Sequence, residues 1–176
     1  MRRALIALTV VLVAAAACVA LISLLASRDS SQVGGASGPG VLEPDRGSRR
    51  LGADAPPTPA SAPDQPPTSG PHRGVAVSRD GAELSDDELL SVLQLGNVVV
   101  AYDSAKAPDA LVALQEEVSG AFDPELAAAG QAVILARRPG VGGVVALAWR
   151  RRLKASGPDD PKLREFAEAW LGQGPG

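Results

Sequence analysis

One stretch of this 176-residue chain, residues 84–102, constrains the fold more than any other. Ser85, followed three residues later by Glu88, is the pattern of a capping box, in which both side chains satisfy backbone groups at a helix start. Leucines at helical spacing follow, and Gly96 stands where a helix end favours a residue with positive φ. The β-branched run 98–102 then predicts a buried strand. The stretch therefore predicts a helix that leads directly into a central strand.

The elements expected after this strand alternate between helix and sheet. Pro108 suits the first turn of a helix that carries an apolar stripe to about residue 122. Residues 131–136 and 144–149 are expected to be strands, and the short glycine-rich connection between them predicts an antiparallel hairpin. A last helix is capped by Asp160, with Pro161 at its first position. A short edge strand over residues 74–77 is expected before the first helix.

This element order predicts an α/β (α+β) fold. We expect a small three-stranded mixed sheet with three packing helices, in an order resembling the later part of a thioredoxin-like fold. That likeness is topological only, because the single cysteine, Cys18, excludes a CxxC redox motif and any disulfide within the chain.

The N-terminus carries an apolar run over residues 4–26, preceded by Arg2 and Arg3. At roughly 20 residues for a bilayer-spanning helix, this run predicts a transmembrane signal anchor behind a cytoplasmic stub of residues 1–3. The positive-inside rule then places the C-terminal part outside the cytoplasm. Two alternatives remain open: a cleaved signal peptide with its site near Ala26, and a lipid attached to Cys18.

The segment 27–71 holds much of the chain's proline, with glycine and serine, and has neither helical nor alternating periodicity. Such a composition buries too little apolar surface to offset its ordering entropy, so it predicts a disordered linker. The globular domain is expected over residues 72–172, with a flexible tail over 173–176. A formal net charge of -3 gives no reason to expect nucleic acid as a partner.

Several segments in the right order resemble one known family. They are the motif PPTSGPH (residues 66–72), the helix and strand of residues 91–102, the strand of residues 144–153, and the last helix with its Gly-Pro ending. The chain resembles the bacterial domain-of-unknown-function family numbered 3105 from Pro66 to its C-terminus. The resemblance implies a membrane-anchored or exported protein.

The resemblance also implies a polar helix face that this chain lacks. The family's H-x-L-E-H-G motif places two histidines one helical turn apart, an arrangement that suits a metal or acid–base site. Here the histidine and glutamate positions hold Ser91, Gln94 and Leu95, and His72 is the only histidine in the chain. No metal, cofactor or catalytic residue is therefore assigned.

Two groups of residues remain as candidate sites. One is a polar pocket of His72, Ser91, Gln94 and Tyr102, although His72 alone is better explained as a hydrogen-bonded residue that holds the entry motif. The other is a basic patch for anionic lipid or envelope polymers. Its members flank the two later strands: Arg137, Arg138, Arg150, Arg151, Arg152 and Lys154.

The preferred hypothesis is a membrane-tethered extracytoplasmic module that binds an envelope protein or another ligand and is not an enzyme. One alternative is a metal-handling or metal-dependent envelope protein with a degenerate site, retaining His72, Glu88 and Asp103. The other is a binder of anionic lipid or cell-envelope polymer through the basic patch.

Overall fold

The computed structural model describes residues 38–175 of the chain, and residues 39 onward form one compact unit. The predicted stub, the transmembrane anchor and its two alternatives lie outside the described residues. Within the described range, no helix has the length and apolar character needed to cross a bilayer.

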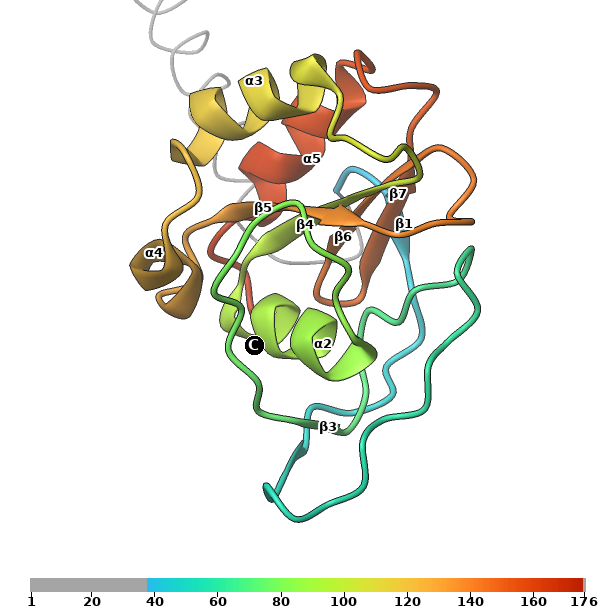
Figure 1. Ribbon diagram of the computed structural model, residues 1–176, viewed down its shortest axis with the longest axis vertical. Helices are drawn as coiled ribbons and strands as arrows, with labels where there is room; N and C mark the ends of the chain where they lie inside the picture. The colour runs from blue at the N-terminus through green and yellow to red at the C-terminus, as the bar shows by residue number, and fades with distance from the viewer. Residues whose placement is uncertain (1–37, 176) are drawn as a thin grey trace, which may run out of the picture. The chain divides into compact units, whose positions relative to one another are not determined.

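The described elements are three two-residue strands, followed by the helices and the longer strands of the domain (Figure 1). They are β1 (Val41–Leu42), β2 (Arg50–Leu51), β3 (His72–Arg73), α2 (Asp86–Leu95), β4 (Val98–Tyr102), α3 (Asp109–Ser119), α4 (Pro124–Ala128), β5 (Val133–Arg137), β6 (Val144–Ala148), β7 (Arg151–Lys154) and α5 (Lys162–Trp170).

The main sheet is mixed and has five strands in the order β1-β7-β6-β4-β5. β4 lies between a parallel neighbour, β5, and an antiparallel neighbour, β6. The mixed α/β class predicted from the sequence is confirmed. The expected sheet of three strands was too small, because β7 and the two-residue β1 extend it beyond β6. Four helices, not three, accompany the sheet in the described part of the chain, since α4 was not predicted.

The predicted hairpin between the second and third strands is wrong. β5 and β6 do not pair, because β4 lies between them. Their connection crosses the end of β4, where Arg138 N–H donates to Tyr102 O at 2.8 Å and Gly140 N–H donates to Asp103 Oδ1 at 2.8 Å. A connection of six residues is long enough to step over one strand, so its shortness alone did not require a hairpin.

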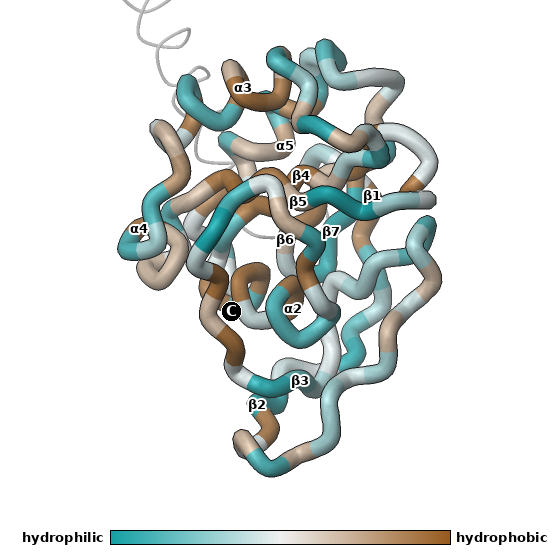
Figure 2. Tube along the Cα trace, in the orientation of Figure 1, coloured by the Kyte–Doolittle hydropathy of each residue, from teal (hydrophilic) through white to brown (hydrophobic). Residues whose placement is uncertain are grey.

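Alternating side chains of β4 divide the core into two clusters, one on each face of the sheet. Val99 and Ala101 pack with α2, whereas Val98, Val100 and Tyr102 pack with α3 and α5. In Figure 1, α2 lies on one side of the sheet and α3 and α5 on the other. Figure 2 shows the hydrophobic colour gathered along the central strands between these layers.

Helix α2 has the two ends that the sequence predicts. Ser85 Oγ accepts the N–H of Glu88, and the Glu88 carboxylate accepts the N–H of Ser85 at 2.8 Å, which completes the capping box. Gly96 ends the helix at φ 105°, a left-handed conformation that glycine adopts without a Cβ clash. β4 begins two residues later, as expected.

The outer edge of β5 is covered along its length. Val133 N–H donates to Ser119 Oγ at 3.0 Å, and Leu135 N–H donates to the carboxylate of Asp80 at 2.7 Å. Arg137 N–H donates to Ala82 O at 3.0 Å. Ser119 at the end of α3 and the chain just before α2 together therefore satisfy the donors that an edge strand leaves open.

The predicted disordered linker differs from the structure from residue 39 onward. This part, residues 39–71, is called here the N-terminal segment. It pairs β1 with β7, and β2 with β3, and it runs around α2 (Figure 1). Its composition offers little apolar surface to bury. The segment is held mainly by polar contacts, which composition alone does not reveal.

Gly130 gives a direct test of how closely α4 approaches the end of α2. A Cβ at Gly130 would overlap the carbonyl oxygen of Leu95, and Gly130 has φ 73°. We expect Gly130→Ala to destabilise the domain by about 3–5 kcal/mol, since it adds overpacking to left-handed strain. Gly142, at φ 76° with open space around it, is the matched control, and Gly142→Ala is expected to lose only about 1–2 kcal/mol. Equal losses by urea unfolding would contradict the close approach.

Candidate functional site

The first turn of α2 carries two buried carboxylates, those of Asp86 and Asp87. Acidic residues are favoured near a helix N-terminus, where the backbone N–H groups are unsatisfied. These two side chains point instead to the N-terminal segment and to the chain that follows β3. They therefore connect parts of the chain that are distant in sequence.

Asp87 is the more extensively bonded of the two. Its carboxylate accepts Thr58 Oγ1–H at 2.6 Å and Thr58 N–H at 3.2 Å. It also accepts Arg73 N–H at 2.9 Å and Arg73 Nε–H at 2.8 Å. Burial by itself would raise the pKa of Asp87, but the hydrogen bonds from Thr58 and Arg73 outweigh it and hold this pKa well below its ordinary value.

Asp86 holds a second part of the N-terminal segment. Its carboxylate accepts Ser61 N–H at 2.6 Å and lies 3.3 Å from a guanidinium nitrogen of Arg138. The same guanidinium donates to Ser61 Oγ at 2.7 Å and to Pro63 O at 2.9 Å. Asp86 and Arg138 thus fix residues 61–63 between α2 and the end of β5.

The PPTSGPH motif has a structural role in this chain. Arg152 donates to Pro66 O at 2.9 Å, and Arg150 N–H donates to Thr68 O at 2.9 Å. Ser69 Oγ accepts Arg46 N–H at 3.0 Å, and its own hydroxyl donates to Pro44 O at 3.2 Å. The motif therefore joins the start of the N-terminal segment to the turn between β6 and β7.

His72, at the end of the motif, is completely buried. Its Nδ1 lies 2.9 Å from Gly70 O, and because a carbonyl only accepts, Nδ1 carries the proton. Nε2 has no hydrogen-bond partner in the described part of the chain. The ring lies beside Trp149, with 6.4 Å between centroids. These contacts agree with a histidine that holds the entry motif.

The other three residues of the predicted polar pocket do not share one cavity with His72. The Ser91 hydroxyl is within donating distance of two carbonyl oxygens, Asp87 O at 2.7 Å and Arg73 O at 2.9 Å. Its oxygen also accepts Val75 N–H at 3.0 Å. Gln94 donates to Ser48 O at 2.6 Å. Both side chains therefore tie α2 to the chain next to β2 and β3, and their hydrogen-bonding groups are largely occupied.

Tyr102 lies apart from the predicted pocket, because its side chain belongs to the cluster on the α3 and α5 face of the sheet. Its hydroxyl lies 3.4 Å from Gly81 O. Burial, and then the nearby Asp80 carboxylate, raise the pKa of Tyr102. Tyr102 is close to α2 in sequence, but side chains alternate along β4, so the Tyr102 side chain lies on the opposite face of the sheet.

The predicted basic patch is divided between the two ends of the sheet. In the register of β5, β4 and β6, Arg137 is level with Val144, whereas the turn at Arg150 lies at the other end of β6. Lys154 is exposed. The guanidinium of Arg151 lies 4.4 Å from the ring of Trp170. The remaining arginines face carboxylates: Arg137 with Glu83, Arg138 with Asp86, Arg150 with Asp45, and Arg152 with Glu43.

A groove of about 350 Å³ lies beside α2, and its size falls within the range of small-ligand sites. We call it the α2 groove. It is lined mainly by small and apolar residues: Arg50, Gly74, Val75, Ala76, Val77, Ser91, Val92, Leu95, Pro124, Ala127 and Ala128. Leu95, at 43% exposure, is one of the few large hydrophobic side chains that the described surface presents.

The α2 groove is lined by Ser91 and Leu95, the two positions at which the resemblance described above implies the histidines of H-x-L-E-H-G. Among the described residues, no group of three or more histidine, cysteine and acidic side chains is placed to hold a metal ion. Glu88 is engaged in the capping box, and Asp103 accepts the N–H of Gly140.

Comparison with known families gives one match. The family model described as "Protein of unknown function (DUF3105)" matches residues 56–176. The chain belongs to the DUF3105 family. The match begins ten residues before the PPTSGPH motif, so the DUF3105 region includes Thr58 and Ser61, the residues that Asp87 and Asp86 hold. No curated protein and no solved structure matches the chain.

Sequence analysis missed the residues that organise this part of the DUF3105 fold. Asp86 and Asp87 were treated only as part of a helix start, and Arg50 and Thr58 were assigned to a disordered linker. One signal was available in the sequence. The first turn holds Asp86 and Asp87 in addition to Glu88 of the capping box, which is more acidic residues than a helix start already capped by Ser85 needs.

Replacing Asp87 with asparagine tests whether its charge holds the N-terminal segment. We expect Asp87→Asn to destabilise the domain by about 2–4 kcal/mol, because it leaves Arg73 without its buried partner and weakens the bonds from Thr58. Asp45→Asn is the control: it removes an exposed pair with Arg150 and is expected to lose less than about 1 kcal/mol. Chemical unfolding of both variants gives the comparison.

The lowered pKa of Asp87 also predicts an acid dependence of stability. A carboxyl whose folded pKa lies below its unfolded value of about 3.9 stabilises the fold above that pH, and the contribution is lost as pH falls towards the folded pKa. The unmodified protein should therefore lose more unfolding free energy below about pH 4 than Asp87→Asn does. Parallel loss in both proteins would show that Asp87 does not carry the effect.

Proposed function

We propose that this DUF3105 protein is a non-catalytic binding module of the cell envelope, and that its ligand occupies the α2 groove. The supporting observation is the chemistry of Ser91 and Leu95, which line the groove at the two histidine positions of the family motif. The Ser91 hydroxyl is used by three backbone groups, and Leu95 has no polar atom. The groove therefore offers apolar surface and no group that titrates near neutral pH.

The same proposal keeps the predicted single-pass anchor and the placement of the domain outside the cytoplasm. The alternative of a metal-handling protein gains little support, because His72 is buried beside Trp149 and has no acidic or sulfur-containing partner in the described structure. The alternative of an anionic-surface binder is likewise disfavoured, since most of the predicted basic residues face carboxylates within the domain.

The metal alternative is tested on the full-length chain in lipid nanodiscs. We expect elemental analysis to find much less than one equivalent of transition metal, and zinc titration by calorimetry to show no stoichiometric site. A single bound metal that survives dialysis would overturn the non-metal part of this proposal. His72→Gln would then show whether the metal depends on the entry motif.

Binding in the α2 groove is tested with benzoate, an apolar carboxylate whose proton signals are distinct from those of lipid. We expect saturation transfer from the nanodisc-embedded protein to benzoate, and at least a tenfold weaker affinity in Leu95→Glu, because a charge would then line the apolar groove. Leu126→Glu is the matched control, since Leu126 is exposed to 38% and does not line the groove. Equal binding by both variants would refute the site.

A further inference from the structure

The chain that borders the α2 groove, residues 74–78, has the exposure pattern of a surface strand. Gly74, Ala76 and Ser78 are exposed, whereas Val75 is half-buried and Val77 is buried. Such a period of two is typical of extended backbone with one face on a core. Figure 2 shows the hydrophobic residues of this segment as brown stretches between β3 and the approach to α2. The edge strand predicted over residues 74–77 thus has the alternating exposure of a strand but forms no ladder.

The ladder beside this segment stops early. β2 pairs with β3 in parallel only at Arg50 with His72 and at Leu51 with Arg73. The chain then turns away after Leu51, in a turn closed by Ala55 N–H and Gly52 O at 3.1 Å. Beyond that point β2 no longer runs beside the extended segment.

Backbone groups of the extended segment are left open where β2 ends. His72 N–H donates to Arg49 O, so His72 faces β2, and alternate residues of an extended chain face the same edge. The carbonyl of Gly74 and both backbone groups of Ala76 lie on that edge, and none of them has a hydrogen-bond partner within residues 38–175. A second strand that continues the path of β2 would satisfy them.

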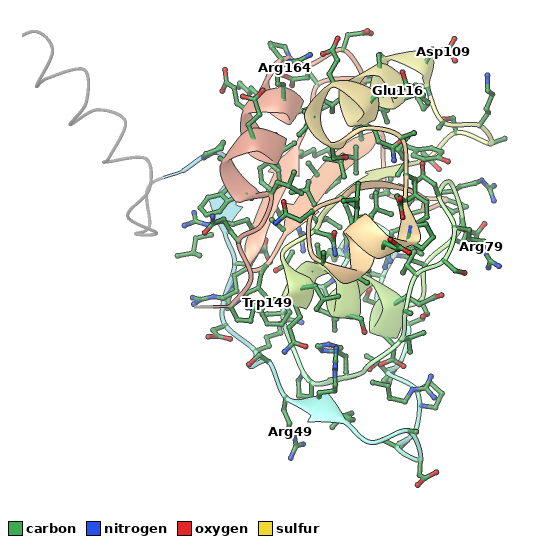
Figure 3. All side chains as sticks on the ribbon, turned by 90° about the vertical axis from the view of Figure 1, so that its left-hand side faces the viewer. Arg49, Arg79, Asp109, Glu116, Trp149 and Arg164 are labelled. Carbon is green, nitrogen blue, oxygen red and sulfur yellow. The ribbon has the colours of Figure 1, made fainter. Side chains whose placement is uncertain are left out.

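Arg50 supplies a charge at the same place. No ion pair in the described chain includes Arg50, and its side chain lies against Gly74, where a Cβ would be 2.8 Å from Arg50 Nε. Arg49, its neighbour just before β2, does not line the groove, and Figure 3 shows the Arg49 side chain pointing away from the domain. A ligand in the groove therefore meets one guanidinium, to which a carboxylate is the complementary group.

We propose that the α2 groove binds an extended peptide, which adds as a strand along residues 74–78. Main-chain hydrogen bonds to Gly74 and Ala76 align the peptide, alternate apolar side chains enter the groove beside Leu95, and a peptide carboxylate pairs with Arg50. This inference rests on the proposed function, because it names the ligand class for the same groove.

The probe is a fluorescein-labelled eight-residue peptide of alternating valine and threonine that ends in a free carboxylate. Fluorescence polarisation with the full-length chain in nanodiscs should give saturable binding. A peptide N-methylated at alternate residues keeps its side chains but loses the donors of one edge, and should bind at least tenfold more weakly. Hydrogen exchange followed by mass spectrometry should show protection of residues 74–78 by the unmodified peptide alone.

Protein variants test the charge. Arg50→Gln should weaken binding of the peptide about two- to fivefold, within the range for a partly exposed ion pair, and an amidated peptide should show the same loss. Arg49→Gln, which removes the neighbouring cation, should leave the affinity unchanged. Equal effects of both variants would overturn the assignment of Arg50.

The outcomes separate this inference from the proposed function. If benzoate binds in a Leu95-dependent manner but neither peptide does, the groove is a binding site and strand addition is wrong. If both peptides bind equally, the backbone edge is not used. If the chain itself dimerises with protection of residues 74–78, the edge pairs with a second copy and the proposal of a foreign peptide is overturned.

Discussion

The buried carboxylate of Asp87 is the interaction on which the arrangement of this domain most depends. It sits at the start of α2 and joins Thr58 from the N-terminal segment to Arg73 from β3. A buried charge is stable only when donors surround it, and here four hydrogen bonds from two distant parts of the chain do so. These bonds hold Thr58 and Arg73 beside α2, and Arg73 directly precedes the residues that form one wall of the α2 groove.

The sheet and the N-terminal segment are stabilised by different kinds of interaction. The sheet lies between two apolar clusters, and β4 is buried at every residue. The N-terminal segment contributes little to either cluster and is attached through ion pairs and backbone hydrogen bonds. We therefore expect the two to respond differently to solution conditions, with acid and salt acting first on the segment and denaturant on the sheet.

The parts of the fold that local patterns specify were predictable. The capping box of Ser85 and Glu88, the glycine end of α2, and the β-branched β4 all follow from neighbouring residues. The strand order does not follow from neighbouring residues, because no local pattern shows that the connection after Arg137 passes over β4. The ordering of residues 39–71 depends on partners far along the chain, such as Arg138 and Arg152, so composition misled.

In the candidate site, too, some features were predictable from the sequence and others depended on the fold. The sequence shows that Ser91 and Leu95 replace the expected histidines. Only the folded structure shows that both residues line one groove with Val75 and Pro124. Tyr102 was grouped with them because sequence proximity does not distinguish the faces of a strand. Arg50 was overlooked for a different reason, since it belongs to a segment that was expected to have no structure.

The covered edge of β5 has a consequence for self-association. With Val133, Leu135 and Arg137 already bonded to side chains and to the preceding loop, that border of the sheet cannot template another chain. Growth into fibrils requires two open borders per molecule, so that each added copy exposes a new one. Because the edge of β5 is already hydrogen-bonded, a strand added elsewhere on the domain would not lead to polymerisation through β5.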